Sequence, residues 1–564
     1  MYWHSIESEA RSHVSINLSE QDIQKIIQSV MKNVEEALGQ PPQETKEVVG
    51  AASPIKPIKM KTINHAESKT DGSLNQEQQK PMIFPGMLTP LGSKPGTHAG
   101  NKTVSSVQSG SENGVFENME DAINAGYKAQ QIYVKNYSMK NREQILTAIR
   151  EAVIKEKEIL AKMVFEETKI GRLEDKIAKH ELAAKTPGTE DLKTDACSGD
   201  AGLTIVEQAP YGLIGAITPV TNPTETIINN TIAMLAAGNG VVFNVHPSSK
   251  KSSAYVINLI NNAIKEAGGP ENLVSMVKNP TMDTIQTLIE SPKVKLLVGT
   301  GGPGLVKTLL QSGKKAIGAG AGNPPVIVDD TADIENAAKS IVLGASFDNN
   351  ILCIAEKEVF VIDSVADDLI FHLLNNGAYM LSPNELAQIE RFVLEENKEN
   401  KAFGCSLNNK REYHVAKEWI GKDAGVILAQ IGVKASSDIR LLICEVDFDH
   451  PLVQLEQMMP ILPIVRVADI DEAIELAVKA EHGNRHTAVI HSKNVDHMTK
   501  FARAIETTIF VQNASSLAGV GYGGEGHTTM TIAGPTGEGI TSPRTYTRQR
   551  RSVLANGGFR IIGG

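Results

Sequence analysis

Long apolar runs, paired cysteines and an excess of basic residues are all missing from this 564-residue sequence. No stretch approaches the roughly 18–20 apolar residues that a membrane helix requires, and the N-terminus lacks the basic-then-apolar pattern of a secretory signal. The formal net charge of −10 argues against nucleic acid as a partner, because phosphate binding favours a basic surface. The four cysteines lie far apart with no CxxC pair, so neither a disulfide framework nor a metal site is expected, and a reducing cytoplasm is the natural compartment.

Near the N-terminus, apolar residues recur at the spacing of one helix face. Ser19 is a suitable N-cap and Gly39 ends the pattern, so the first segment, residues 1–39, is expected to contain a helix over residues 19–38. The apolar stripe consists of Ile23, Ile26, Ile27, Val30, Met31, Val34 and Leu38.

Residues 40–113 separate this stripe from the rest of the chain and are rich in Pro, Gly, Ser, Lys, Gln and Thr. Such a composition buries too little apolar surface to offset chain entropy, so this segment is expected to be a flexible linker. A tethered helix of about 20 residues is marginal in water, so we expect the stripe to dock on a partner protein. Packing against its own domain or an oligomer neighbour remains an alternative. The acids on its polar face disfavour a membrane surface.

From residue 114 onward, short β-branched runs alternate with helical patterns, and the low aromatic content of 4% predicts an aliphatic core. Strands are expected over 240–245, 273–277 and 294–300, and helices over 281–291 and 305–312. A further helix follows the first of these strands, with one apolar face made of Val256, Leu259, Ile260, Ala263, Ile264 and Ala267. This alternation predicts βαβ units and a parallel sheet, the α/β class.

A glycine-rich loop, GTGGPG over residues 299–304, lies between a predicted strand and a predicted helix. It matches the G-x-G-x-x-G pattern, in which bare backbone at a helix N-terminus allows a cofactor to approach closely. The acid that a dinucleotide site carries about 20 residues later is missing, because no acid precedes Asp329. A purely structural turn explains the motif equally well.

Cys353 follows Asn349 and Asn350 and precedes a charged turn and an apolar run, which is typical of a junction between a loop and a strand. A lone cysteine is more often inert packing. In its wider context, however, the sequence resembles the aldehyde dehydrogenase superfamily, and its CoA-acylating branch most closely, over residues 114–564. The motifs that carry this resemblance occur in the family's order and are PYGLIGAITPVTNPTETIINNTIAMLAAGNGVVFNVHP (210–247), VGTGGPG (298–304), GAGAGNPPVIVDDTAD (318–333), NNILCIAEKEVFV (349–361), HPLVQLEQMMPILPIV (450–465) and GPTGEG (534–539).

The resemblance implies an aldehyde-dehydrogenase-like α/β fold. The amphipathic helix and the disordered linker come before this fold in the chain. Residues 114–321 are expected to form a Rossmann-type NAD-binding domain and residues 322–530 an α/β catalytic domain. Residues 531–564 are expected to return to the cofactor and oligomerisation region. The family's exchanged strands also imply a small oligomerisation hairpin and a homo-oligomer.

The resemblance implies that Cys353 is the covalent nucleophile. It also implies that the side chain of Asn222 donates a hydrogen bond to the oxyanion. Because the thiolate is the reactive species, we expect backbone dipoles or a nearby cation to depress the pKa of Cys353. NAD is implied as the cofactor, although Asn244 stands where hydrolytic relatives often carry a ribose-binding lysine. The expected cofactor-binding residues are Thr218, Pro219, Asn244, His246, Pro247, Gly299, Thr300, Gly301, Gly302 and Glu456.

The acyl acceptor is inferred from a missing carboxylate. Hydrolytic aldehyde dehydrogenases carry a glutamate that activates water, and the corresponding position here falls at about Gly318. No acid lies between Glu290 and Asp329, so a small error in the alignment does not change this conclusion. Without that base water is a poor nucleophile, whereas a thiol attacks thioesters readily, so the expected acceptor is coenzyme A.

Within this branch, the chain most resembles the propionaldehyde and acetaldehyde dehydrogenases of bacterial microcompartments. Those enzymes carry an encapsulation helix on a flexible linker, so residues 19–38 are expected to bind a shell protein and place the enzyme in the compartment lumen. The expected substrate is a short aldehyde, propionaldehyde first, with acetaldehyde and lactaldehyde open. Two other hypotheses remain, a hydrolytic enzyme with a relocated base and a catalytically silent cargo protein.

Overall fold

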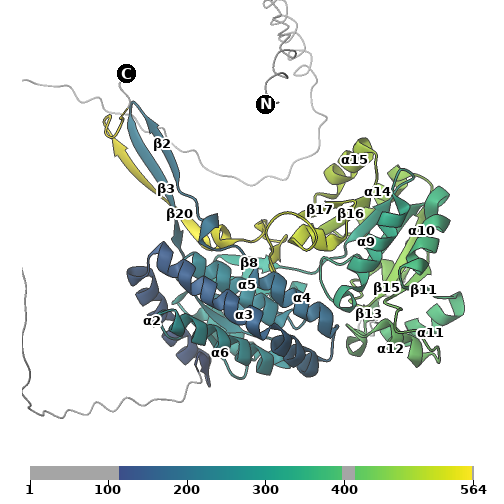
Figure 1. Ribbon diagram of the computed structural model, residues 1–564, viewed down its shortest axis with the longest axis horizontal. Coiled ribbons are helices and arrows are strands. Elements are labelled where there is room, and N and C mark those ends of the chain that lie inside the picture. The colour runs from purple at the N-terminus through teal and green to yellow at the C-terminus, as the bar shows by residue number, and fades with distance from the viewer. Residues whose placement is uncertain (1–112, 397–412, 562–564) are drawn as a thin grey trace, which may run out of the picture. The chain divides into compact units, whose positions relative to one another are not determined.

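The computed structural model describes residues 113–396 and 413–561, which form two large parallel sheets and several smaller antiparallel ones (Figure 1). The predicted docking helix and, apart from Asn113, the predicted linker lie outside the described residues. Among the helices of the described ranges, none is long and apolar enough to cross a bilayer.

The first parallel sheet has six strands in the order β1-β6-β5-β4-β7-β8. These are β1 (Val115–Phe116), β4 (Leu213–Ile217), β5 (Gly240–Asn244), β6 (Val274–Val277), β7 (Val294–Thr300) and β8 (Ala316–Ala319). Consecutive parallel strands need crossover connections, and helices provide them here, so the expected βαβ arrangement is confirmed. The predicted strands and helices of this part agree with the observed ones to within two residues at each end.

Different helices cover the two faces of this sheet. On one face α3 (Met139–Thr168), α5 (Pro223–Ala236) and α6 (Lys250–Glu266) pack against one another over an aliphatic core. On the other face α7 (Met282–Glu290) and α8 (Pro303–Leu310) form a second core, and α2 (Met119–Asn136) contributes to both. On α6 the predicted apolar face is buried at Val256, Ile260, Ala263 and Ile264 and half-buried at Leu259 and Ala267.

The second parallel sheet has seven strands in the order β11-β14-β15-β10-β9-β16-β17. These are β9 (Pro325–Val328), β10 (Glu358–Ile362), β11 (Ala378–Met380), β14 (Leu441–Glu445), β15 (Ile461–Val467), β16 (Thr487–His491) and β17 (Ile509–Gln512). Side chains of β10 alternate between two cores, because successive residues of a strand point to opposite faces. The helices of this half are α9 (Ile334–Ser346), α10 (Asp363–Asn375), α11 (Pro383–Val393), α12 (Ala424–Gln430), α13 (Pro451–Gln454), α14 (Ile470–Ala480) and α15 (Val495–Ile505).

An antiparallel sheet of β2 (Asp195–Gly199), β3 (Gly202–Pro210) and β20 (Thr547–Ala555) joins the end of the chain to its first half. Just before β20, Tyr546 is buried in the core of the first sheet, and its carbonyl accepts a hydrogen bond from Asn239 Nδ2 at 2.9 Å. Two short pairs, β12 (Leu394–Glu396) with β13 (Tyr413–Val415) and β18 (Ile532–Ala533) with β19 (Gly539–Ile540), complete the described sheets. An oligomerisation role for β2, β3 and β20 remains a prediction.

The predicted domain boundary lies in the short sequence segment that connects the two large sheets. The last strand of the first sheet ends at Ala319 and the first strand of the second begins at Pro325, so the division proposed at 321/322 falls in the connection. The assignment of these parts to NAD binding and to catalysis, and the separate segment 531–564, remain predictions.

Replacing Phe360 with alanine should lower the free energy of unfolding by about 3–5 kcal/mol, because this ring is fully buried in the central strand β10 and its removal leaves a cavity. The midpoint of urea unfolding, followed by circular dichroism, measures the change. Phe371→Ala is the matched control, since that ring is 59% exposed on α10 and its loss should change stability little. Equal midpoints for the two variants would contradict the observed packing.

Candidate active site

The loop that carries Cys353 has an unusual backbone. Asp348, Asn349 and Asn350 all adopt the left-handed region, with φ angles of 48°, 54° and 64°. This conformation is costly for residues other than glycine and persists only where the surroundings hold it. Here Asn350 Nδ2 donates to the carbonyls of Ala345 and Glu356 at 2.8 and 2.9 Å, and Asn349 Nδ2 donates to a third carbonyl. The polar residues before the cysteine therefore shape the loop.

A buried lysine occupies the inside of this loop. Lys357 Nζ donates to the backbone carbonyl of Asn350 at 2.8 Å, to its Oδ1 at 2.5 Å and to the carbonyl of Leu352 at 3.3 Å. Burial lowers the pKa of this ammonium, whereas Glu456 and Cys353 act to raise it. The loop thus wraps around the amino group of Lys357, which lies close enough to Cys353 for the two groups to affect each other's pKa.

Cys353 itself is half-buried, and its protonation differs from the expectation. Burial raises the pKa of the thiol to about 12, and the carboxylate of Glu456 adds to this effect. Lys357 and the backbone N–H groups of Cys353 and Ile354 lower the pKa, as expected of a cation and of backbone dipoles, but they are outweighed. The expected depression is therefore wrong for this structure, and the resting side chain is a thiol at neutral pH.

Asn222 lies at the N-terminus of α5, directly before Pro223. Its Oδ1 accepts a hydrogen bond from the buried Lys179 Nζ at 2.7 Å, while its Nδ2 has only a long contact of 3.4 Å with Thr221 Oγ1. The donor end of the amide therefore remains available for a ligand.

The expected cofactor residues other than Glu456 lie at or just after the carboxyl ends of β4, β5 and β7. Ile217 pairs with Asn244 and with Gly299, so Thr218, Asn244 and Thr300 follow or end neighbouring strands. Pro219 comes next after Thr218. The buried hydroxyls of Thr218 and Thr300 have no hydrogen-bond partner among the described residues. Unpaired buried hydroxyls at this edge of a parallel sheet fit a bound ligand, because such edges are where α/β folds bind nucleotides.

The two loops beside this edge are ordered by local hydrogen bonds. His246 and Pro247 are exposed, and His246 Nδ1 accepts from the Ser248 N–H at 3.2 Å. In the glycine loop, the N–H of Gly301 donates to the Ala319 carbonyl at 3.1 Å, and Gly302 caps α8. Pro303 occupies the first turn of that helix, two residues before the predicted start. On β5, Asn244 Oδ1 accepts from Thr284 Oγ1 at 2.6 Å.

The position where hydrolytic relatives carry a base has no room for one. A Cβ on Gly318 would lie 2.7 Å from Val306 Cγ1, and the Gly318 N–H donates to Thr536 Oγ1 at 3.1 Å. At Gly320 a Cβ would lie 3.1 Å from Pro535 Cγ. The segment 534–539 therefore packs over this glycine-rich stretch, and the structure adds a steric reason to the missing carboxylate.

Gly322 brings three candidate residues together. A Cβ at this position would lie 2.6 Å from the Cys353 carbonyl oxygen and 3.0 Å from His486 Cγ. The backbone of Gly322 also hydrogen-bonds to Glu456, which lowers the pKa of that carboxyl, although burial raises it overall. Glu456, expected to contact the cofactor, is thus also part of the electrostatic surroundings of the nucleophile.

His486 lies beside this loop and was not singled out from the sequence. Burial lowers the pKa of this imidazole to about 4, with a contribution from Lys357, so it is neutral at pH 7. Its Nδ1 lies 2.9 Å from Thr487 Oγ1, and its Nε2 is buried with no partner among the described residues. The unpartnered nitrogen can form a hydrogen bond with a ligand, although a pKa of about 4 makes this imidazole a weak base. The available signal was weak, a single histidine directly before the apolar run of β16.

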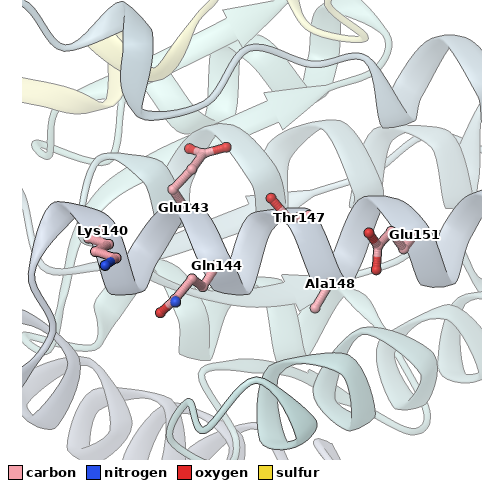
Figure 2. Close-up of a pocket in the computed structure, with 6 residues that line it drawn as sticks. All are labelled: Lys140, Glu143, Gln144, Thr147, Ala148 and Glu151. Atoms are coloured by element: carbon pink, nitrogen blue, oxygen red, sulfur yellow. The ribbon is translucent and has the colours of Figure 1, made fainter.

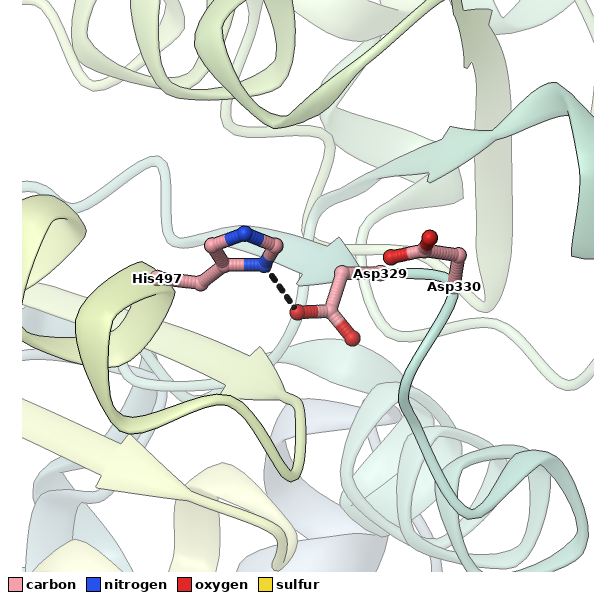
Figure 3. Close-up of side chains that lie close together, drawn as sticks. All are labelled: Asp329, Asp330 and His497. Atoms are coloured by element: carbon pink, nitrogen blue, oxygen red, sulfur yellow. Dashed lines mark hydrogen bonds and ion pairs between the residues drawn. The ribbon is translucent and has the colours of Figure 1, made fainter.

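Two other features lie outside this site. Figure 3 shows Asp329, Asp330 and His497, but the Asp329 carboxylate is already bound by Ser492 Oγ, Thr331 Oγ1 and His497 Nδ1 at 2.5–2.7 Å. Its oxygens therefore have protein partners and give no reason to assign a metal ion. Figure 2 shows a groove lined only by one face of α3, at Lys140, Glu143, Gln144, Thr147, Ala148 and Glu151, and none of these belongs to the site.

Comparison with known proteins agrees with this geometry. The profile of the aldehyde dehydrogenase family matches residues 97–541. The chain is 47% identical over 453 residues to the acetaldehyde dehydrogenase (acetylating) EutE of Escherichia coli K12, covering 80% of this chain and 94% of the relative. A propionaldehyde dehydrogenase from the Clostridium phytofermentans fucose utilisation bacterial microcompartment superposes with a TM-score of 0.75 at 49% identity, covering 80% of this chain and all of that one. Rhodopseudomonas palustris propionaldehyde dehydrogenase, solved with bound CoA and an acylated cysteine, gives the same TM-score and identity over 78% of this chain and 98% of that one.

Glu456→Gln should speed alkylation of Cys353 by iodoacetamide at pH 8, because removing the carboxylate lowers the pKa of the thiol and raises the thiolate fraction about tenfold for each unit. In the unsubstituted protein the rate should climb with pH from 7 to 10 without a plateau, since the thiol stays protonated below a pKa of about 12. Mass spectrometry of the Cys353 peptide measures both. Glu390→Gln is the control, because that carboxylate acts on Cys444 instead. An unchanged Cys353 rate in Glu456→Gln would refute the electrostatic coupling.

Proposed function

Because the chain belongs to the aldehyde dehydrogenase family, we propose that it oxidises a short-chain aldehyde, propionaldehyde foremost, and passes the acyl group to coenzyme A. The observation that carries this proposal is the pairing of Cys353 with a glycine-rich stretch that holds no carboxylate and no space for one. The products are an acyl-CoA and NADH.

In the proposed mechanism, Cys353 loses its proton and its sulfur forms a bond to the aldehyde carbon. The resulting oxyanion needs two donors, and we assign them to Asn222 Nδ2 and the Cys353 backbone N–H. NAD supplies the two-electron oxidant when it is bound, and the product of oxidation is a thioester on Cys353. The thiol proton leaves to solvent, because the His486 imidazole beside the same loop, with a pKa lowered to about 4, is too weak a base to hold it.

Release of the acyl group is proposed to require the thiol of coenzyme A. Water would need a general base, and Val306, Thr536 and Pro535 occupy the space around the positions where the family keeps one. The thiolate of coenzyme A attacks the thioester, the bond to Cys353 Sγ breaks, and the cysteine is regenerated. The acylated cysteine and the bound CoA of the Rhodopseudomonas palustris relative support this order of events.

For the cofactor we propose the edge of the first sheet. The unpaired hydroxyls of Thr218 and Thr300 and the start of α8 fit a phosphate-bearing dinucleotide. The full set proposed to hold NAD is Thr218, Pro219, Asn244, His246, Pro247, Gly299, Thr300, Gly301, Gly302 and Glu456.

We further propose that the enzyme works inside a bacterial microcompartment as a homo-oligomer. The compartment relative supports the location, and the amphipathic pattern over residues 19–38 supports docking on a shell protein. Exposed Val553 and Leu554 on β20 support an interface between copies.

Propionaldehyde and NAD should yield NADH at a high rate only when CoA is present, because the thioester on Cys353 has no activated water to release it. Absorbance at 340 nm measures the rate, and a short aldehyde series separates propionaldehyde from acetaldehyde and lactaldehyde. Cys353→Ala should abolish turnover, whereas Cys197→Ala, an exposed cysteine on β2, should not. Equally fast turnover without CoA would instead support a hydrolytic enzyme.

Deleting residues 1–40 should leave the activity of the free enzyme unchanged, because every proposed catalytic residue lies beyond the linker. The truncated enzyme should no longer co-purify with microcompartment shells, as measured by blotting purified shells. A full-length variant with Ile26 and Val30 changed to aspartate tests the apolar stripe without removing the tail. Normal encapsulation of both variants would rule out the docking role.

A further inference from the structure

Lys179 connects the two halves of the proposed site. It lies on α4 (Leu173–Ala184) and is 1% exposed. Its Nζ is 2.7 Å from Asn222 Oδ1 and 2.5 Å from Asp348 Oδ2, with Glu225 Oε1 and the Thr221 carbonyl each at 3.3 Å. A single ammonium therefore contacts both the proposed oxyanion donor and the loop that leads to Cys353.

An ammonium group fixes the orientation of an amide that it binds. Lysine can only donate hydrogen bonds, so the oxygen of Asn222 must face Lys179 and the NH₂ group must face away. If the amide turned over, two donors would oppose each other in a buried site, and the oxygen would face the oxyanion. Lys179 thus selects the one amide orientation that can stabilise negative charge on the substrate.

At its other partner, Lys179 holds the start of the nucleophile loop. The Asp348 carboxylate also accepts from Lys176 Nζ at 3.1 Å and from the Arg172 N–H at 2.6 Å. Asp348 is the first of the three left-handed residues, so these bonds set the direction in which the chain approaches Cys353. Lys176 shares this task but has no contact with Asn222 in the structure.

The charge on Lys179 is stable in this setting. Burial alone would lower its pKa, but the carboxylates of Asp348 and Glu225 outweigh burial and raise it. Glu225 is buried as well, and its pKa falls to about 2 beside Lys179, His180 and Lys176. Lys179 and Glu225 are therefore ionised at neutral pH, whereas burial lowers the pKa of the neighbouring Lys176 and His180.

We propose that Lys179 is a positioning residue that fixes the donor end of Asn222 and couples it to the loop of Cys353. This inference rests on the proposed function, because it assumes that Asn222 stabilises an oxyanion. It assigns Lys179 no contact with substrate.

A double-mutant cycle on the full-length enzyme tests the coupling. Asn222→Ala should lower kcat by about 10²- to 10³-fold, and Lys179→Met should lower it by about 10- to 100-fold with little change in KM for propionaldehyde. Lys179→Met should have no further effect in the Asn222→Ala background, because its effect passes through that amide. Multiplicative effects of the two substitutions would overturn the proposal.

Lys176→Met is the matched control, since it removes a buried lysine from the same helix and from the same carboxylate without touching Asn222. It should keep kcat within about threefold of the unsubstituted enzyme. Iodoacetamide should label Cys353 at an unchanged rate in Lys179→Met, because Lys176 and the Arg172 N–H still bind Asp348 and keep the loop in place. An equal loss of kcat in both lysine variants would reduce Lys179 to a structural role.

Lys179→Met leaves buried carboxylates without one of their partners and can fail to fold, so a second pair of variants is needed. The cycle is then run on Lys179→Met with Glu225→Gln, which removes one charge of each sign, against Glu225→Gln alone. A harmless Asn222→Ala would overturn the oxyanion assignment and this inference together. CoA-independent turnover with an intact non-additive cycle would overturn only the proposed acceptor.

Discussion

The loop that leads to Cys353 depends on buried lysine side chains. They stabilise a left-handed backbone conformation that steric repulsion disfavours. Lys179 and Lys176 bind the carboxylate of Asp348 where the left-handed run begins, and Lys357 binds the oxygens of Asn350 where it ends. A buried lysine needs oxygen partners, and the loop supplies carbonyl and carboxylate oxygens in this conformation. Stabilising the charge and shaping the loop are thus the same interaction.

Burial also sets the protonation of Cys353, the proposed nucleophile, and of His486 beside its loop. Burial raises the pKa of the Cys353 thiol and lowers the pKa of the His486 imidazole. Both groups are therefore neutral at rest, although a thiol becomes charged by losing a proton and an imidazole by gaining one. A neutral thiol beside a neutral imidazole protects the cysteine at rest, because a permanently ionised thiolate would be open to oxidation and alkylation. Binding of ligands that change the charge or hydration near Glu456 and Lys357 would shift this balance.

The sequence predicted the parts of the molecule that local pattern determines. The β-branched runs at 240–245 and 294–300 and the glycine loop before Pro303 were found because their neighbours in sequence are also their neighbours in the fold. Other features depend on distant segments. The pKa of Cys353 follows from burial and from Glu456, about a hundred residues away, and the contact between Lys179 and Asp348 spans 169 residues. Neither leaves a local pattern, so the direction of the pKa shift was wrong and both Lys179 and His486 were missed.

The position of Tyr546 has a consequence for how the protein is made. This side chain completes the core of the first sheet, and β20 after it pairs with β3, yet both are synthesised after the whole second sheet. The first half of the chain therefore leaves the ribosome with an open core and an unpaired strand edge, which are aggregation hazards in a nascent protein. Translation must finish before the core of the first sheet can close, so chaperone demand should track the time the ribosome spends on residues 322–530.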